Sequence, residues 1–266
     1  MSRFILKVAN ALVSAVVLVA LVVAGLYSGY ALWDNNQIYA AAENVQEDMI
    51  RLKPQVEEGE ETGPSFAELL AVNEDVCAWV TVEETNIDYP VLQGEDNLSY
   101  INMDVYGDFA LAGSIFLDSR NDRNFADNYS LLYGHHMANG SMFGDLDLFE
   151  EKEFFDQHRS GELLLPDRMY DLDIFACMLV PASENKIFDP TRWQADIKGL
   201  LDFAEQESLF CRAEVVEQLR AENAPQILAL STCSSDFTNA RTIVLAVMKE
   251  KMPEIGEDVN DEEELP

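Results

Sequence analysis

Residues 8–33 constrain the fold more than any other part of the chain, because they contain no charged side chain and are almost wholly apolar. At about 1.5 Å per residue, a helix of this length crosses the hydrocarbon core of a bilayer, which is about 30 Å thick. Arg3 and Lys7 precede the segment, and Asp34 follows it. This charge distribution predicts a single-pass membrane anchor, with residues 1–7 in the cytoplasm and the rest of the chain outside the cell.

A cleaved signal peptide is the alternative, because the three alanines at residues 40–42 resemble a small-residue cleavage site. However, the apolar run is longer than the apolar region of a usual signal peptide. The polar residues 34–37 also separate it from these alanines. Both features favour a retained anchor.

Composition limits what the rest of the chain can do. With 266 residues, of which 48% are hydrophobic, it can bury one good core. The formal net charge is −32, from 17 basic and 49 acidic residues. This argues against a nucleic-acid partner, because phosphate binding needs clustered Lys and Arg. The acidity is more typical of a solvated surface than of a site for basic partners.

Changes in composition divide the chain after the anchor into three segments. Residues 34–64 combine a helical stalk, with apolar spacing that ends at Pro54, and an acidic linker. A single folded domain is expected over residues 65–252. Residues 253–266 form an acidic tail without a basic residue, which predicts disorder.

The pattern of apolar residues in the folded domain predicts mainly β structure, in the α+β class. Eight strands are expected at residues 76–82, 87–92, 113–117, 129–133, 162–165, 170–180, 226–232 and 242–248. Helical patterns occur at residues 141–150, 151–157 and 190–206. Eight strands with helices between them suggest a closed barrel with peripheral helices.

Cys233 is the candidate nucleophile, because it ends the strand-like run that begins at Ile227. Arg241 begins the next strand-like run, with a loop over residues 234–240 between the two. A thiol and a guanidinium at the mouth of one loop suit acyl transfer, in which a nucleophile and an oxyanion donor act together. The other cysteines, Cys77, Cys177 and Cys211, lie in apolar runs and are expected to be small core residues rather than disulfide partners.

His135 and His136 follow the expected strand at residues 129–133, and either could serve as the general acid or base. His158, in a polar turn, is expected to be a surface residue. The histidines and cysteines do not show metal-ligand spacing, so neither a metal nor another cofactor is expected.

These motifs resemble those of the sortases, membrane-anchored cysteine transpeptidases of Gram-positive bacteria. The sortase signature is Thr-Leu-x-Thr-Cys, with an Arg shortly after it and a His upstream. Residues 229–233 match it, except that Ala229 stands in place of the first Thr, inside the strand. Class B is the most similar class, because residues 73–80, 85–93, 112–118 and 133–143 resemble its sequence blocks in the same order.

The resemblance implies an eight-stranded sortase β-barrel as the catalytic domain, and it assigns roles to three residues. Cys233 would attack the carbonyl after the Thr of a sorting signal and form a thioacyl intermediate. His135, directly after the glycine as in class B, would protonate the leaving amine, and Arg241 would hold the oxyanion or the substrate backbone. His136 stands where class B often has Asn, so packing or loop capping is favoured for it.

Two further residues, Ser231 and Thr232, could donate hydrogen bonds in the substrate pocket, although strand packing is an equal alternative. The implied substrates are secreted proteins with a sorting signal, either Asn-Pro-x-Thr or a Pro-x-Thr-Gly variant. The acceptor would be a peptidoglycan cross-bridge amine, which anchors the protein to the cell wall, or a pilin amine.

Two other classes of function remain as alternatives. One is a cysteine peptidase that acts mainly as a hydrolase, although papain-like enzymes place Cys before His, with the Cys opening a helix. The other is a non-catalytic, membrane-anchored binding module.

Overall fold

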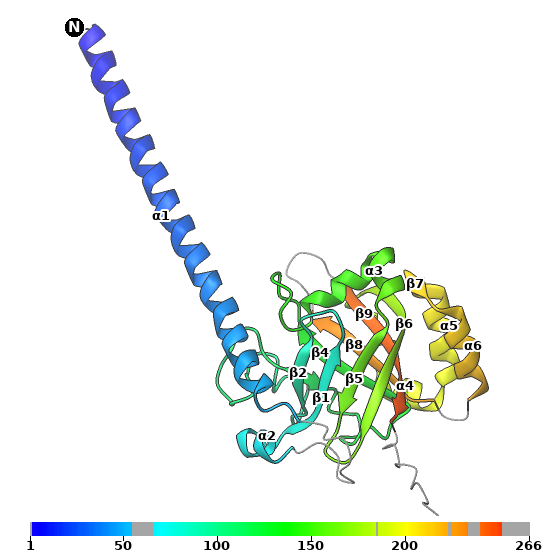
Figure 1. Ribbon diagram of the computed structural model, residues 1–266. Coiled ribbons are helices and arrows are strands. Elements are labelled where there is room, and N and C mark those ends of the chain that lie inside the picture. Colours follow the sequence, from blue (N-terminus) through cyan, green and yellow to red (C-terminus); the bar gives the residue numbers. More distant parts are fainter. Residues whose placement is uncertain (1, 55–65, 185, 223–224, 234–239, 252–266) are drawn as a thin grey trace, which may run out of the picture. The chain divides into compact units, whose positions relative to one another are not determined.

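The computed structural model describes residues 2–54, 66–184, 186–222, 225–233 and 240–251 (Figure 1). The chain divides into two compact units, Met1–Ala41 and Ala42–Pro266. The acidic linker and the acidic tail expected from the sequence lie outside the described residues.

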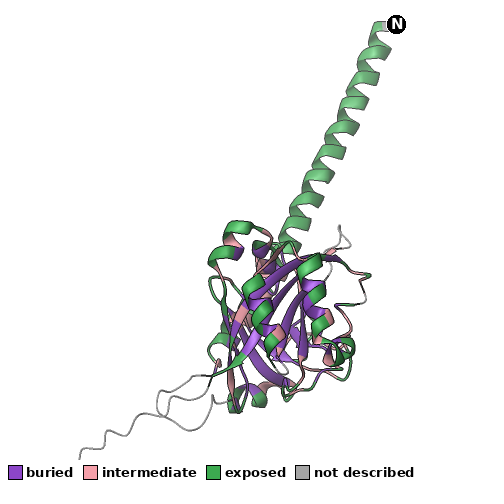
Figure 2. Ribbon diagram, turned by 90° about the vertical axis from the view of Figure 1, so that its right-hand side faces the viewer, coloured by how far each residue is buried: buried purple, intermediate pink, exposed green. Residues whose placement is uncertain are grey.

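The first unit is helical throughout its described part. Helix α1 (Ser2–Ile50) runs through the expected anchor and into the expected stalk without a break. It is long and apolar enough to cross a membrane, with a mean hydropathy of 2.5 over its most apolar stretch. The apolar side chains of that stretch are exposed (Figure 2).

The second unit is built on a closed β-barrel, which confirms the predicted fold class. Eight strands pair in the order β5-β1-β2-β3-β4-β8-β9-β6, and β5 pairs again with β6 to close the ring. The strands are β1 (Val76–Val82), β2 (Asp88–Leu92), β3 (Ile115–Leu117), β4 (Tyr129–His135), β5 (Ser160–Leu164), β6 (Met169–Pro181), β8 (Ile227–Cys233) and β9 (Ala240–Glu250). The two-residue strand β7 (Phe210–Cys211), which the sequence pattern did not predict, adds to β6 outside the ring.

Helical segments connect and cover these strands (Figure 1). They are α2 (Ala67–Val72), the 3₁₀ helix η1 (Gly144–Glu150), α3 (Lys152–Gln157), α4 (Pro190–Ala195), α5 (Ile197–Glu207) and α6 (Ala213–Ala221). The single helix predicted over residues 190–206 is two helices, because the chain turns at Asp196, whose carboxylate accepts a hydrogen bond from the N–H of Gly199 at 2.9 Å. Helix α6 is a further element that the sequence pattern missed.

Strand β4 illustrates how the core is built. Every residue of β4 except His135 is buried, so both faces of the strand are covered. Tyr129 and Leu131 belong to the same apolar cluster as Trp193 of α4 and Leu200 of α5. Figure 2 shows the buried strands enclosed by helices with exposed outer faces. This double coverage explains why the strands are near-continuous apolar runs in the sequence.

The end of α1, from Ala42 onward, belongs to the folded unit. Met49 is only 2% exposed and is part of the core cluster. Gln46 Nε2 donates a hydrogen bond to the carbonyl oxygen of Asn86 at 2.9 Å. Lys53 Nζ lies 2.7 Å from Asp88 Oδ1, in an ion pair whose two side chains are both largely covered from solvent. A chain that starts at residue 65 therefore lacks core contacts that a chain starting at Ala42 keeps.

In a chain that starts at Ala42, Met49→Ala is expected to lower the free energy of unfolding by about 2–4 kcal/mol, because it leaves a cavity in the core. Urea denaturation measures this loss. Ile50→Ala is the matched control, since Ile50 is the next residue of the same helix and is 42% exposed. Equal losses in the two variants would contradict the core position of Met49.

Candidate active site

Strand register brings together the ends of three neighbouring strands. Strands β4 and β8 pair in parallel from Tyr129–Ile227 to His135–Cys233, where both strands end. Strands β8 and β9 pair antiparallel as far as Ser231–Ile243. Two residues beyond this pair, β8 reaches Cys233 and β9 has Arg241. Neighbouring strands lie about 4.8 Å apart, so these positions are side by side. Cys233 is described by its backbone only, and residues 234–239 lie outside the described residues.

The imidazole of His135 is fixed by one hydrogen bond. Its Nε2 lies 2.7 Å from the carbonyl oxygen of Ile101, in the connection between β2 and β3. Because a carbonyl oxygen can only accept, Nε2 carries the proton in this contact. Nδ1 is therefore the nitrogen left for exchanging a proton with another group.

Arg241, the second residue of β9, is half-buried and pairs with Val180 of β6. Its guanidinium carbon lies 5.0 Å from the centroid of the Phe188 ring, a distance at which the ring attracts the cation. Its Nε is buried and has no hydrogen-bond partner among the described residues. A buried donor without a partner costs free energy unless a ligand satisfies it.

Ser231 and Thr232 are both buried, and their hydroxyls make contacts within the sheet. Ser231 Oγ donates to the carbonyl oxygen of Thr232 at 3.1 Å. Thr232 Oγ1 accepts from the backbone N–H of Thr242 at 3.1 Å. These contacts are compatible with strand packing, and substrate binding by the two hydroxyls stays a prediction.

Three thiols can be assessed directly. Cys77 and Cys177 are buried and Cys211 is half-buried, all as free thiols. Burial raises the pKa of Cys77 and of Cys177 to about 12 and that of Cys211 to about 11. Since the thiolate is the nucleophile, these three cysteines are poorly suited to attack a carbonyl.

The imidazole of His136 has a different hydrogen-bond partner from the imidazole of His135. Its Nε2 lies 2.6 Å from Asp147 Oδ2 on η1, and this hydrogen bond raises the pKa of His136. Although burial alone raises the pKa of Asp147, the hydrogen bonds from His136 and Thr242 lower it overall. The two groups therefore form an ion pair over a wider pH range than free side chains would.

The turn after His135 is held at several points. The N–H of Phe143 donates to the carbonyl oxygen of His135 at 3.0 Å, and His136 pairs with Met142 in an antiparallel bridge. The N–H of Met142 donates to Tyr89 Oη at 2.8 Å. Burial raises the pKa of Tyr89 to about 12, so its hydroxyl stays neutral. These contacts fix the backbone that carries both histidines.

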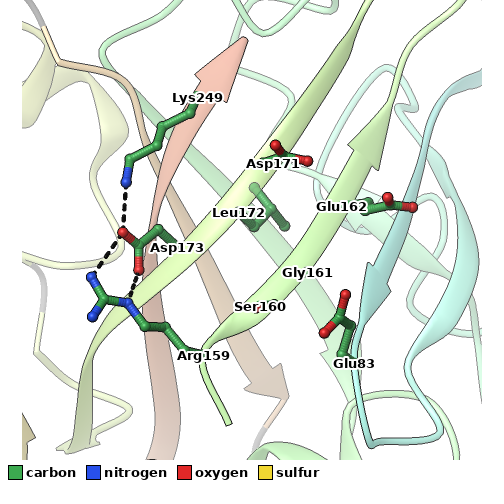
Figure 3. A pocket seen from close by; sticks show the side chains of 9 residues that line it. All are labelled: Glu83, Arg159, Ser160, Gly161, Glu162, Asp171, Leu172, Asp173 and Lys249. Atoms are coloured by element: carbon green, nitrogen blue, oxygen red, sulfur yellow. Dashed lines mark hydrogen bonds and ion pairs between the residues drawn. The ribbon is translucent and has the colours of Figure 1, made fainter. Parts of the chain in front are cut away.

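A surface depression of about 360 Å³ on β5, β6 and β9 is a second place to consider (Figure 3). Asp173 lines it and forms ion pairs with Arg159 and with Lys249. Lys249 lies eight residues along β9 from Arg241, a distance of about 26 Å at strand spacing. The depression is thus far from the three strand ends, and its two cations are already paired.

Sequence reasoning missed three groups beside the strand ends: the Ile101 carbonyl, Asp147 and Thr242. A backbone carbonyl leaves no signal in a sequence. Asp147 is one of several acids in and around η1, and Thr242 follows Arg241 in an ordinary strand pattern. Only the fold distinguishes them.

The chain is similar to known proteins over most of its length. Residues 80–249 match the sortase domain family. Sortase B of Listeria monocytogenes is 30% identical over 186 residues, which cover 69% of this chain and 74% of that protein. Sortase B of Staphylococcus aureus is 27% identical over 190 residues, which cover 71% of this chain and 76% of that protein.

Solved structures agree with these matches. A class B sortase of Streptococcus pyogenes involved in pilus biogenesis is 40% identical with a TM-score of 0.60, covering 69% of this chain and 97% of that one. A substrate complex of Staphylococcus aureus sortase B is 27% identical with a TM-score of 0.66, covering 82% of this chain and 98% of that one. The similarity therefore extends from sequence to fold.

The His136–Asp147 pair should make stability depend on pH. Because the folded-state pKa of His136 is raised, its contribution is fully present below its unfolded pKa of about 6.5 and is lost as the pH rises through the folded pKa. His136→Asn should thus lower the free energy of unfolding more at about pH 5.5 than at about pH 9, as measured by urea denaturation at each pH.

Asp147→Asn should remove the same pH-dependent part of the free energy of unfolding, because it removes the negative charge that pairs with His136. The contribution of Asp147 itself is present above its unfolded pKa of about 3.9 and is lost as the pH falls through its lowered folded pKa. An effect of His136→Asn that is equal at both pH values would count against the ion pair.

Proposed function

This chain belongs to the class B sortases, a family of cysteine transpeptidases, and we propose that it cleaves secreted proteins at a sorting signal and transfers the acyl group to an amine. The observation that carries the proposal is the strand register, with His135 opposite Cys233 and Arg241 at the adjacent end of β9. Residues in register on neighbouring strands face the same side of a sheet, which supports a common site for the three.

Cys233 is the proposed nucleophile. Its thiolate sulfur attacks the carbonyl carbon after the Thr of the sorting signal, and the scissile C–N bond then breaks to leave a thioacyl intermediate. This assignment is supported by the raised pKa values of Cys77, Cys177 and Cys211, which make these three thiols poor nucleophiles. A cation beside the thiol stabilises the thiolate, and both His135 and Arg241 can supply one.

His135 is the proposed general acid and base. With Nε2 held by the carbonyl of Ile101, the proton for the leaving amine comes from Nδ1. In the second half of the reaction, the acceptor amine attacks the thioester carbonyl and gives its proton back to Nδ1. The C–S bond then breaks, and the thiolate of Cys233 is regenerated.

Arg241 is the proposed donor to the oxyanion or to the substrate backbone. The Nε–H, which has no partner among the described residues, supports this role, because such a donor needs no rearrangement when negative charge develops on the substrate. The ring of Phe188 holds the guanidinium in place. Ser231 and Thr232 contribute mainly by ordering the strand.

The acceptor and the location complete the proposal. We favour a peptidoglycan cross-bridge amine, so that secreted proteins become anchored to the cell wall. Pilin joining is the second candidate, and the Streptococcus pyogenes relative involved in pilus biogenesis favours it. Helix α1 would hold the enzyme in the membrane with its N-terminus in the cytoplasm, because Arg3 and Lys7 precede the apolar stretch.

The test is cleavage of quenched fluorescent peptides that carry Asn-Pro-x-Thr or Pro-x-Thr-Gly, by the full chain in detergent micelles. Cys233→Ala should abolish cleavage, and His135→Ala should lower kcat on the order of 100-fold or more. Arg241→Lys should lower kcat by a similar factor, because it loses the Nε–H donor. His136→Ala should retain more activity than His135→Ala, because the ring of His136 is bound to Asp147 and acts only through that carboxylate.

Cleavage that persists in Cys233→Ala would overturn the proposal. An added amine, such as a cross-bridge peptide or a pilin fragment, should appear in the product and raise the rate. If only the hydrolysed peptide forms with every amine, the chain acts as a cysteine peptidase. The amine that is incorporated distinguishes wall anchoring from pilin joining.

The proposed orientation predicts where a thiol reagent that cannot cross membranes reacts on intact cells. A cysteine placed after α1 at Leu98, which is 73% exposed, should be labelled as Leu98→Cys, whereas Ser2→Cys should be labelled only after lysis. The Cys233→Ala background removes the proposed reactive thiol from the measurement. Labelling of Ser2→Cys on intact cells would reverse the orientation.

A further inference from the structure

A hydrogen-bonded cluster lies beside the three strand ends and has no part in the chemistry proposed above. We call His136, Asp147, Thr232 and Thr242 the rim cluster. Thr232 and Thr242 are each 3% exposed, while His136 and Asp147 are partly covered. Asp147 comes from η1, His136 directly follows β4, and Thr232 and Thr242 lie near the ends of β8 and β9.

The contacts within the rim cluster form one continuous chain. Asp147 Oδ2 accepts from His136 Nε2 at 2.6 Å, and Asp147 Oδ1 accepts from Thr242 Oγ1 at 2.9 Å. The backbone N–H of Thr242 donates to Thr232 Oγ1 at 3.1 Å. One oxygen of the Asp147 carboxylate thus accepts from the residue after β4, and the other accepts from Thr242 of β9. Thr242 in turn binds Thr232 of β8.

The position of the cluster in the sequence gives it a mechanistic meaning. His136 directly follows His135, Thr232 directly precedes Cys233, and Thr242 directly follows Arg241. Consecutive Cα atoms are only 3.8 Å apart, so a displaced member moves its catalytic neighbour. A misplacement of about 1 Å in a catalytic group can cost about 100-fold in rate.

We propose that Asp147 is a positioning residue, which holds the segments that carry His135, Cys233 and Arg241 in their working arrangement. This inference rests on the proposed function of those three residues. Asp147 acts through its two hydrogen bonds and does not touch the substrate. His136 thereby has a role of its own, as the cation that orients this carboxylate.

Glu150, at the end of η1, does not replace Asp147 in this role. Its Oε1 also lies 2.7 Å from Thr242 Oγ1, but the single hydroxyl proton of Thr242 must be shared between the two carboxylates. Only Asp147 also accepts a hydrogen bond from His136 among the described contacts. Loss of Asp147 therefore removes the side-chain link between His136 and Thr242, and Glu150 alone cannot replace it.

The test compares Asp147 with Asp145, a carboxylate on the same 3₁₀ helix. Asp145 also accepts two hydrogen bonds, at 2.7 and 2.8 Å, but both come from Asn86, away from the proposed catalytic strands. With the full chain in detergent micelles and a sorting peptide, Asp147→Ala should lower kcat on the order of 10- to 100-fold, with KM changed by less than about threefold. Asp145→Ala should change kcat by less than about threefold.

A milder series keeps the test decisive if Asp147→Ala does not fold. Asp147→Asn keeps the shape and loses the charge, so it should lower kcat less than Asp147→Ala does. The double variant His136→Asn with Asp147→Asn should be no slower than Asp147→Asn alone, because the two residues act as one unit. Rates are expressed per folded protein, with the folded fraction taken from circular dichroism.

A second readout needs no substrate. The rate at which iodoacetamide alkylates Cys233, followed by mass spectrometry at neutral pH, should fall in Asp147→Asn and stay unchanged in Asp145→Asn. A kcat for Asp147→Ala within about threefold of the unchanged chain, or an equal loss in Asp145→Ala, overturns the inference. Cleavage that survives Cys233→Ala instead overturns the proposed function, so the two failures can be told apart.

Discussion

The parallel pairing of β4 with β8 is the constraint on which both the barrel and the candidate site depend. It joins residues far apart in the chain, from Tyr129–Ile227 to His135–Cys233. Because parallel neighbours need a long crossover, the connection carries β5, β6 and helices η1 to α6 before the chain returns as β8. Tyr129, Leu131 and Tyr133 alternate along β4 and belong to the large apolar cluster, so a slip by one residue would turn them to the other face and is disfavoured.

Placing the proposed catalytic positions at strand ends combines rigidity with access. The strands are held by ladder hydrogen bonds, whereas their last residues lie where the chain leaves the sheet. Separate segments then hold each side chain: the carbonyl of Ile101 holds His135, and the ring of Phe188 lies against Arg241. Asp147 links the neighbouring residues across the same three strands. The candidate site is thus assembled from at least five parts of the chain around one register.

The strands were more predictable than the helical connections. Alternation and apolar runs predicted all eight barrel strands to within a few residues, because burial on the barrel wall imposes that pattern directly. The helix expected over residues 190–206 is interrupted at Asp196, where a local cap competes with helix continuation. Strand β7 is too short to leave a pattern, and α6 is amphipathic but short. The inclusion of Met49 in the core was also hidden, since the same helix continues the apolar anchor.

By itself, the sequence determined the apolar N-terminal segment, the eight strands, the family and the candidate residues, because each of these depends on local composition or on motifs contiguous in the chain. Only the tertiary structure decided which histidine lies opposite Cys233 and which pairs with Asp147, although the two are consecutive. It also decided that the carbonyl of Ile101 and the carboxylate of Asp147 belong beside the site. The physical reason is that hydrogen bonds act over about 3 Å in space, whereas these partners are separated in the sequence by elements whose positions only the closed barrel fixes.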